Sequence, residues 1–234
     1  MLALAGSIAS SQAVLIAYEG FDTANAIGSD ASAAGVTGSG FSAYVNTNFR
    51  YDLEAGLGYS DSSGNTLVSV GRSAGIDVVA GGTQNLQLTL SSTISNTGTV
   101  FMSFVTHQTA GTSWGYAAGL TDAAVTDSAS PTSALEAAFR STSSNYGIYG
   151  DSTGIDARTG PDSTPPAYNP FFVVAELKMD TGVETMTIYL NPTDLANVSG
   201  TAAVTMTDTL SSGTWDDMTT FLFSNAGDEL GLID

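Results

Sequence analysis

The chain has 234 residues, no cysteine and a formal net charge of −18, which arises from 23 acidic and only five basic residues. The missing cysteine excludes thiol catalysis, disulfides and cysteine-ligated metals, and the negative charge argues strongly against nucleic acids and anionic membrane surfaces as partners. Hard cations, calcium first, are the small partners that such a chain favours, because calcium prefers oxygen ligands. The alternative explanation of the charge is an acidic surface that keeps a β-protein soluble.

Residues 1–18 are apolar and small, but this run is too short and too interrupted to span a bilayer. Ser11-Gln12-Ala13 has the small-x-small form of a signal-peptidase site. Residues 1–13 are therefore expected to be either a signal-peptide remnant or an apolar strand that pairs with its own sheet or with that of a neighbouring subunit. Residues 14–234 are expected to form one β-sandwich domain, since such folds often reach about 200–250 residues.

The first two thirds of the chain contain short apolar or alternating segments separated by turn residues, which predict strands. Expected strands are Val14–Phe21, Gly40–Tyr44, Leu67–Val70, Ile76–Val79, Leu86–Leu90, a core strand at Val100–Thr106, Ser113–Leu120 and Tyr146–Tyr149. Ala123–Ala138 is the one stretch with helical character, because Ser130-Pro131 suits an N-cap followed by proline. Asp151–Tyr168 is expected to be an exposed loop, since it holds three of the six prolines.

The segment Pro170–Pro192 gives the clearest structural prediction. Before Asp180-Thr181-Gly182, one face holds Val173, Ala175, Leu177 and Met179, and the other holds Val174, Glu176 and Lys178; after it, Met186, Ile188 and Leu190 alternate with Thr185, Thr187 and Tyr189. Period-two alternation on both sides of a short connection predicts an antiparallel hairpin with one buried face. Gly182 suits the turn, and Asn191-Pro192 ends the second strand because proline has no N–H for the ladder.

Three further strands are expected beyond this hairpin. They are a short edge strand at Ala202–Met206, after a loop at Asp194–Thr201, and strands at Thr219–Ser224 and Glu229–Ile233. About a dozen short strands and at most one short helix predict an all-β, antiparallel sandwich.

Three segments in this order resemble a known family: AYEGFD (Ala17–Asp22), VVAELKMDTGVETMTIYLNP (Val173–Pro192) and DELGLI (Asp228–Ile233). They are similar to the concanavalin A-like, LamG-type jelly rolls of secreted bacterial surface proteins, many of which carry a PEP-CTERM sorting tail. The Pro-Glu-Pro motif of that tail is not found in these residues. The resemblance implies a two-sheet jelly roll and a secreted, extracellular or cell-surface location in a bacterium. It implies little about the ligand, because this fold hosts lectins, glucanases and structural modules.

The residues offer little support for catalysis. Jelly-roll glucanases carry Glu-x-Asp-x-x-Glu on one strand, which sets two carboxylates together for retaining hydrolysis. Glu176, Asp180 and Glu184 do not have that spacing, so surface carboxylates are the preferred interpretation. His107 is the one histidine, and at a strand end it is expected to be structural rather than part of a Ser-His-Asp triad.

Calcium is the one cofactor considered, and none is expected to be required. Asp61 with Asn65, and Asp216 with Asp217, are the loop clusters chosen as candidate oxygen ligands, and Asp151 with Asp156 is a further cluster. Asp and Asn also populate turns because they bond their own backbone, which is the competing explanation.

Trp114, Tyr116 and Trp215 are the candidate carbohydrate-binding residues, because aromatic faces stack on sugar rings. Trp114 in the core is the alternative explanation for that residue.

We therefore expect a non-catalytic, extracellular structural or adhesive β-sandwich that self-assembles through its N-terminal strand. The alternative is a lectin-like carbohydrate-binding module assisted by calcium, and a glycoside hydrolase is a remote third hypothesis. The expected partners are further copies of the chain or an extracellular polysaccharide, without membrane insertion of the mature domain. A concave face of Thr, Ser and Val beside an open sheet edge would favour assembly, whereas a concave face that carries exposed Trp and Tyr would favour glycan binding.

Overall fold

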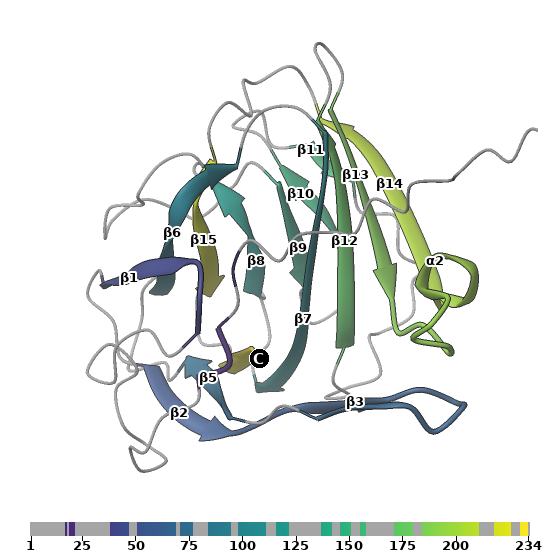
Figure 1. The fold of residues 1–234 in the computed structure, drawn as a ribbon, viewed down its shortest axis with the longest axis horizontal. Helices are drawn as coiled ribbons and strands as arrows, with labels where there is room; N and C mark the ends of the chain where they lie inside the picture. The colour runs from purple at the N-terminus through teal and green to yellow at the C-terminus, as the bar shows by residue number, and fades with distance from the viewer. Residues whose placement is uncertain are drawn as a thin grey trace, which may run out of the picture.

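The computed structural model describes residues 17, 19–21, 38–46, 51–68, 71–76, 84–94, 98–110, 116–121, 137–141, 146–150, 155–157, 171–179, 184–210, 218–225 and 230–233 (Figure 1). Its strands are β1 (Phe41–Asn46), β2 (Tyr51–Ala55), β3 (Gly58–Ser60), β4 (Thr66–Val68), β5 (Arg72–Ile76), β6 (Gln84–Ile94), β7 (Gly98–Ala110), β8 (Tyr116–Thr121), β9 (Ala137–Ser141), β10 (Tyr146–Gly150), β11 (Ile155–Ala157), β12 (Phe171–Met179), β13 (Glu184–Leu190), β14 (Val204–Leu210), β15 (Met218–Asn225) and β16 (Leu230–Ile233). Within these residues the one helix is α2 (Val198–Thr201), of four residues.

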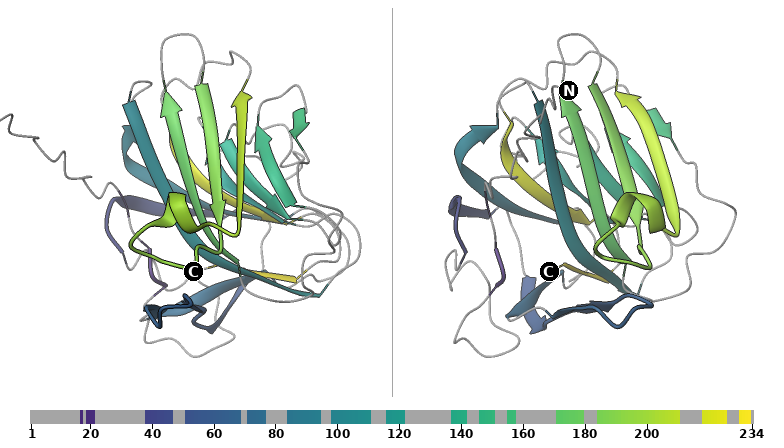
Figure 2. Two further views of the ribbon diagram at one scale, coloured as in Figure 1. Left: turned by 90° about the vertical axis from the view of Figure 1, so that its right-hand side faces the viewer. Right: turned by 45° about the vertical axis from the view of Figure 1, so that its right-hand side comes forward.

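The strands form two seven-stranded antiparallel sheets and a separate two-stranded hairpin, β3–β4. The first sheet has the order β1-β6-β15-β8-β9-β10-β11, and the second has the order β14-β13-β12-β7-β16-β5-β2. Figures 1 and 2 show the two sheets as two layers, with β7, β12, β13 and β14 in front in Figure 1. The predicted all-β, antiparallel, two-sheet sandwich is confirmed.

The core lies between the two sheets and takes its side chains from both. Phe104 of β7 meets Phe139 of β9 and Phe221 of β15 across it, with ring centroids 6.3 and 6.4 Å apart. Phe223 and Phe139 have no exposed surface at all. Aromatic side chains bury more apolar area than any others, so these contacts hold the sheets together.

The β12–β13 hairpin follows the predicted alternation residue by residue. Val173 pairs with Leu190, Ala175 with Ile188 and Leu177 with Met186, and all six of these side chains are buried. The intervening residues from Val174 to Tyr189 are partly or fully exposed. The predicted buried face is therefore confirmed, while Gly182 lies outside the described residues.

Asn191 closes the end of this hairpin in a way that explains why the strand stops there. Its φ of 46° is left-handed, which asparagine tolerates better than most residues. The Asn191 N–H donates to the Phe172 carbonyl at 3.0 Å, and the Phe172 N–H donates to Asn191 Oδ1 at 2.8 Å. The side chain thus replaces the next backbone acceptor before Pro192.

Two predicted elements are wrong in the described part of the chain. Ala137 and Ala138, at the end of the predicted helix Ala123–Ala138, lie in strand β9, which pairs with β8 and β10. Pairing with two neighbouring strands overrides the local helix signal there. The predicted first strand at Val14–Phe21 is not formed by its described residues, and Phe21 has a left-handed φ of 48°.

Smaller differences concern connections. Strand β11 lies within the predicted loop Asp151–Tyr168, and α2 lies within the predicted loop Asp194–Thr201. The predicted strand Ile76–Val79 is shifted, since β5 ends at Ile76. Apolar residues indicate that a strand is present but not where it begins and ends, so predicted strand boundaries differ from the observed ones by a few residues.

Candidate functional site

The outer face of the second sheet carries a regular set of exposed side chains on its four neighbouring strands β7, β12, β13 and β14. The strand register places them in three rows of four. None of the twelve is buried. We call them the hydroxyl face: Thr99, Lys178, Thr185 and Thr209; Phe101, Glu176, Thr187 and Thr207; Ser103, Val174, Tyr189 and Thr205.

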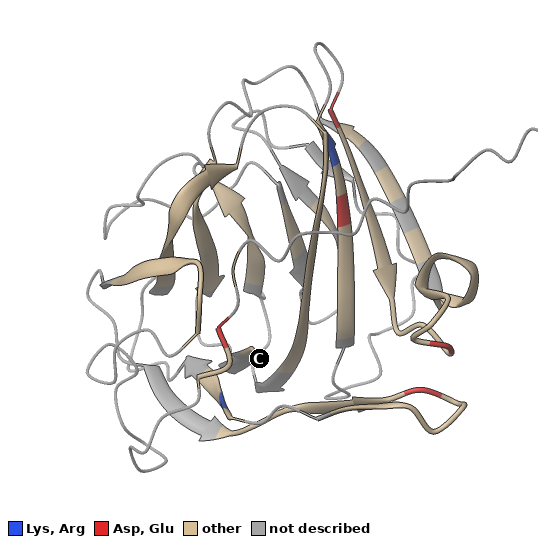
Figure 3. Cartoon of the chain, viewed as in Figure 1, with Lys and Arg blue, Asp and Glu red and all other residues tan. Residues whose placement is uncertain are grey.

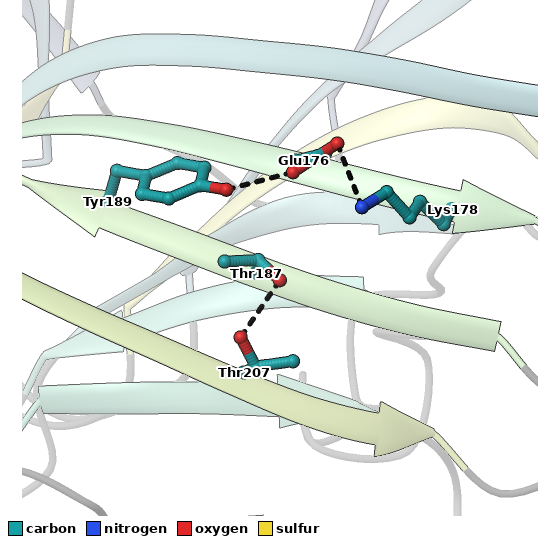
Figure 4. Close-up of polar contacts among 5 residues, drawn as sticks. All are labelled: Glu176, Lys178, Thr187, Tyr189 and Thr207. Atoms are coloured by element: carbon teal, nitrogen blue, oxygen red, sulfur yellow. Dashed lines mark hydrogen bonds and ion pairs between the residues drawn. The ribbon is translucent and has the colours of Figure 1, made fainter. Parts of the chain in front are cut away.

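Three polar contacts hold side chains of this face in place (Figure 4). The Thr187 and Thr207 hydroxyls lie 2.9 Å apart across two strands. The Tyr189 hydroxyl donates to Glu176 Oε2 at 2.9 Å, and Lys178 Nζ lies 3.2 Å from Glu176 Oε1. Glu176 is therefore engaged on both oxygens, and its charge is offset by a neighbouring ammonium.

Burial raises the pKa of Tyr189 above its usual value, and the hydrogen bond to Glu176 and the charge of that carboxylate raise it further. Both effects act against the phenolate, because it loses hydration and meets a negative neighbour. With the folded pKa raised, the contribution of Tyr189 to stability is complete below about pH 10 and is lost as the pH rises through the raised pKa.

Replacing Glu176 by glutamine should bring the pKa of Tyr189 closer to 10, since the charge is removed while burial remains. The tyrosinate absorbance of each protein is titrated against its own Tyr189→Phe counterpart, so that the difference isolates one tyrosine. An identical pKa in the two backgrounds would contradict the assigned contact.

Phe101 is the most exposed large apolar side chain in the described chain, at 59%. It pairs with Glu176 across β7 and β12, at the margin of the hydroxyl face. The predicted core strand Val100–Thr106 lies within β7, where Phe104, Val105 and Thr106 are buried while Phe101 and Ser103 are exposed on the outer face.

On the first sheet, by contrast, many of the outward-facing side chains are buried. The buried residues that alternate with the core positions there are Gln87, Ala117, Thr121, Ala138, Thr220, Leu222 and Ser224. The middle of the first sheet is therefore inaccessible from outside, while its exposed described residues lie on β1 and the end of β6: Ser42, Ala43, Ser91, Ser92 and Thr93.

The β3–β4 hairpin covers one end of the outer face of the second sheet. Tyr59 lies against Phe172, with ring centroids 5.3 Å apart, and its hydroxyl donates to the Pro192 carbonyl at 2.9 Å. Ser62 Oγ donates to the Thr193 carbonyl at 2.8 Å. The hydroxyl face thus ends where this hairpin begins.

Asp61 connects the β3–β4 turn to the segment around Leu195 through hydrogen bonds, and the residue is only 8% exposed. Its Oδ1 accepts the N–H groups of Ser63 and Asn65, at 2.9 and 2.8 Å. Its Oδ2 accepts Asn65 Nδ2 at 2.8 Å and the Leu195 N–H at 3.0 Å. These hydrogen bonds, that from Leu195 foremost, lower the pKa of Asp61 despite its burial.

The candidate calcium residues are thus placed in part. Asp61 and Asn65 lie together in the β3–β4 turn and bond each other, while Asp216, Asp217 and Asp151 lie outside the described residues. No group of three or more acidic, histidine or cysteine side chains fit to hold a metal occurs within those residues. Calcium binding therefore stays a prediction.

Of the candidate glycan-binding aromatic residues, Tyr116 alone lies in the described part of the chain. Tyr116 begins β8 of the first sheet, and Trp114 and Trp215 lie outside the described residues. Their role stays a prediction. The sequence signal that was missed is the alternation of Thr205, Thr207 and Thr209 on an edge strand, beside Thr185 and Thr187 on the next strand.

The catalytic candidates rejected on sequence are also separated in space. Glu176 belongs to the outer face of the second sheet, while Glu184 lies two residues before the buried Met186, on the inner face of β13. His107, predicted to lie at a strand end, lies within β7, and the serine of the same strand, Ser103, is four residues away, about 13 Å along the strand and too far for a hydrogen bond.

No family model matches the sequence, and no curated protein sequence matches it. Among solved structures, the Trypanosoma (T. cruzi) calreticulin globular domain aligns with a TM-score of 0.50 and 11% identity, over 82% of this chain and 81% of that one. Peanut lectin, solved with a nine-residue peptide, gives 0.49 and 8% over 81% and 92%. Lotus tetragonolobus seed lectin gives 0.44 and 11% over 81% and 89%. At these identities a likeness is one of fold. No helix in the described chain is long and apolar enough to cross a membrane.

Proposed function

We propose that the chain is a non-catalytic structural or adhesive β-sandwich that acts outside the cell and makes its contacts through the hydroxyl face. The observation that carries this proposal is the openness of that face. Twelve side chains on four strands are all accessible, and eight of them end in a hydroxyl group.

The residue composition of the hydroxyl face is better suited to binding a partner than to catalysing a reaction. Threonine and serine hydroxyls are weak nucleophiles unless a base activates them, and the one carboxylate of the face is engaged by Lys178 and Tyr189. Hydroxyl groups both donate and accept hydrogen bonds, so a flat array of them can bind a partner that presents the same groups.

Self-association through the N-terminal strand belongs to this proposal. Residues 1–13 lie outside the described part of the chain, and their pairing is inferred from the apolar sequence alone. Strand β14 stands at the end of the second sheet, and an edge strand offers backbone groups with which an added strand can pair.

Negative-stain microscopy should show ordered assemblies of the full chain that disappear when residues 1–20 are removed, because the added strand is then missing. Each form is imaged with calcium and with chelator, which also tests whether the cation assists. Dispersed monomers of the full chain in both buffers would contradict self-association.

A further inference from the structure

The hydroxyl face presents complementary chemistry to an identical copy of itself. Eight of its twelve side chains end in a hydroxyl group, and a hydroxyl both donates and accepts hydrogen bonds. We propose that the hydroxyl face binds the hydroxyl face of a second copy of this chain, with the two sheets stacked about a twofold axis. This inference rests on the proposed structural function and names the partner of its surface, through a contact separate from the pairing of the N-terminal strand.

Charge favours this face as the place where two copies meet. Molecules with a formal charge of −18 repel one another. The one acid of the face, Glu176, is paired with its one base, Lys178, at 3.2 Å, so the charge of the chain arises from residues outside it. Figure 3 shows how few charged residues lie on the described parts of β7, β12, β13 and β14. An approaching copy therefore meets no net repulsion from the face itself, while a charged macromolecule finds no net charge there to bind.

The side chains of the face are short enough for two sheets to stack closely. Eight of the twelve are threonine, serine or valine, and sheets that pack face to face lie about 10 Å apart with interdigitating side chains. The Thr187 and Thr207 hydroxyls bond each other at 2.9 Å, and Tyr189 is fixed by Glu176. These contacts hold the face in one arrangement before binding, which lowers the entropy lost when a second copy arrives.

Phe101 adds an apolar group to the contact. It is 59% exposed and lies in the middle row of the face, beside Glu176. A twofold axis brings the same ring from both molecules, so each pair removes two large apolar surfaces from water.

The size of the face makes a single pair weak. Four strands and five residues of each give a patch roughly 15 to 20 Å on a side, about 300 Å², whereas a standard protein interface buries about 800 Å² on each partner. A twofold contact also engages both faces and stops at two molecules, while strand exchange with the next molecule continues without closing. Stacked pairs would therefore join two such chains of molecules side by side, and each pair would be strengthened by its linked neighbours.

Single-cysteine variants of the full chain test the contact directly, because the chain has no cysteine of its own. Thr187→Cys places a thiol near the centre of the hydroxyl face, and Thr93→Cys places one at an exposed position of β6, in the first sheet. A short bis-maleimide joins two thiols across the about 10 Å between stacked sheets. Thr187→Cys should give at least about fivefold more linked dimer than Thr93→Cys, since the pair raises the effective concentration of the two central thiols.

Two features of this design make the result specific. Each yield is divided by the rate at which the same thiol reacts with a monofunctional maleimide, so that the accessibility of the thiol does not enter the comparison. A contact between the hydroxyl face and any other surface would hold the two Thr187→Cys thiols apart, so linking reports the stacking of like faces.

A second substitution in the Thr187→Cys variant tests the role of neutrality. Thr205→Glu should lower linking to the level of Thr93→Cys, because a carboxylate on each face must lose its water within the contact. Thr93→Glu changes the net charge equally but should keep linking within about twofold, since it acts from the other sheet. Added salt should increase linking, because it screens the repulsion between acidic molecules. Linking of Thr187→Cys no greater than that of Thr93→Cys, linking that Thr205→Glu leaves unchanged, or linking that salt removes would each overturn the inference.

Negative-stain microscopy of the original chain separates this failure from failure of the proposed function. Assemblies that form without linked dimers would leave the structural role in place and remove the pairing of faces. Linked dimers of a chain that forms no assemblies would leave the pairing of faces in place and remove the role of the N-terminal strand. If neither is seen, both proposals fall.

Discussion

Replacing Phe223 by alanine should lower the free energy of unfolding by about 3–5 kcal/mol, the cost typical of emptying a buried aromatic site. Phe223 has no exposed surface, and it lies on β15 between Leu86 of β6 and Ala118 of β8. Small neighbours such as Ala118 cannot fill the cavity, so the lost packing is not recovered. Urea unfolding followed by circular dichroism measures the effect.

Phe101→Ala is the matched control for this change. The same side chain is removed from the same kind of strand, but from a position that is 59% exposed, so the cost should stay within about 0.5 kcal/mol. Similar losses for the two variants would contradict the assignment of Phe223 to the core and Phe101 to the surface.

Asp61→Asn should detach the β3–β4 hairpin from the segment around Leu195. An asparagine oxygen can replace Oδ1, but its NH₂ group would then face two donors, Asn65 Nδ2 and the Leu195 N–H, which now bond Oδ2. A buried donor left without an acceptor is destabilising. Hydrogen exchange at Asn65 and Leu195 should accelerate strongly, whereas Ser62→Ala, which removes one exposed hydrogen bond, should change it little.

The pH dependence gives this prediction a second, independent readout. Because the pKa of Asp61 is lowered in the folded chain, its stabilising effect is complete above the ordinary value of about 3.9 and is lost as the pH falls through the lowered pKa. The difference in melting temperature between the original chain and Asp61→Asn should therefore narrow in acid. A difference that persists unchanged well below pH 3.9 would contradict the role of the charge.

The hairpin β12–β13 could be predicted from sequence because one physical rule governs it throughout. One face is buried and the other is not, so buried and accessible side chains alternate from Val173 to Met179 and again from Thr185 to Leu190. Asn191 and Pro192 end the second strand through the backbone properties of these two residue types, and such properties can be recognised in a sequence.

The hydroxyl face could not be predicted in the same way, because it depends on which strands become neighbours. Strand β7 pairs antiparallel with β12 along the whole of Phe171–Met179, although about 60 residues separate the two strands in the sequence. Nothing in the β7 segment VFMSFVT tells Phe101 from Phe104 until the partner strand fixes which face is inside. The threonine alternation of β14 was visible, but its meaning required the sheet order.

The wrong helix has a related cause. Ala137, Ala138 and Phe139 follow a stretch whose apolar spacing suits a helix. In the structure they nevertheless form strand β9, which pairs with β8 on one side and with β10 on the other. Tertiary pairing decides such short alanine-rich segments, since their intrinsic preference is worth only a few tenths of a kcal/mol per residue.

The hydroxyl face differs from the rest of this acidic molecule in that it carries no net charge. Its one acid and one base are paired at 3.2 Å, so the formal charge of −18 arises from residues outside this face, and the face adds no net repulsion toward a neighbouring molecule. In a crowded layer, neighbouring molecules can approach most closely through these neutral faces, and the ionic strength of the medium sets how far apart their other sides remain.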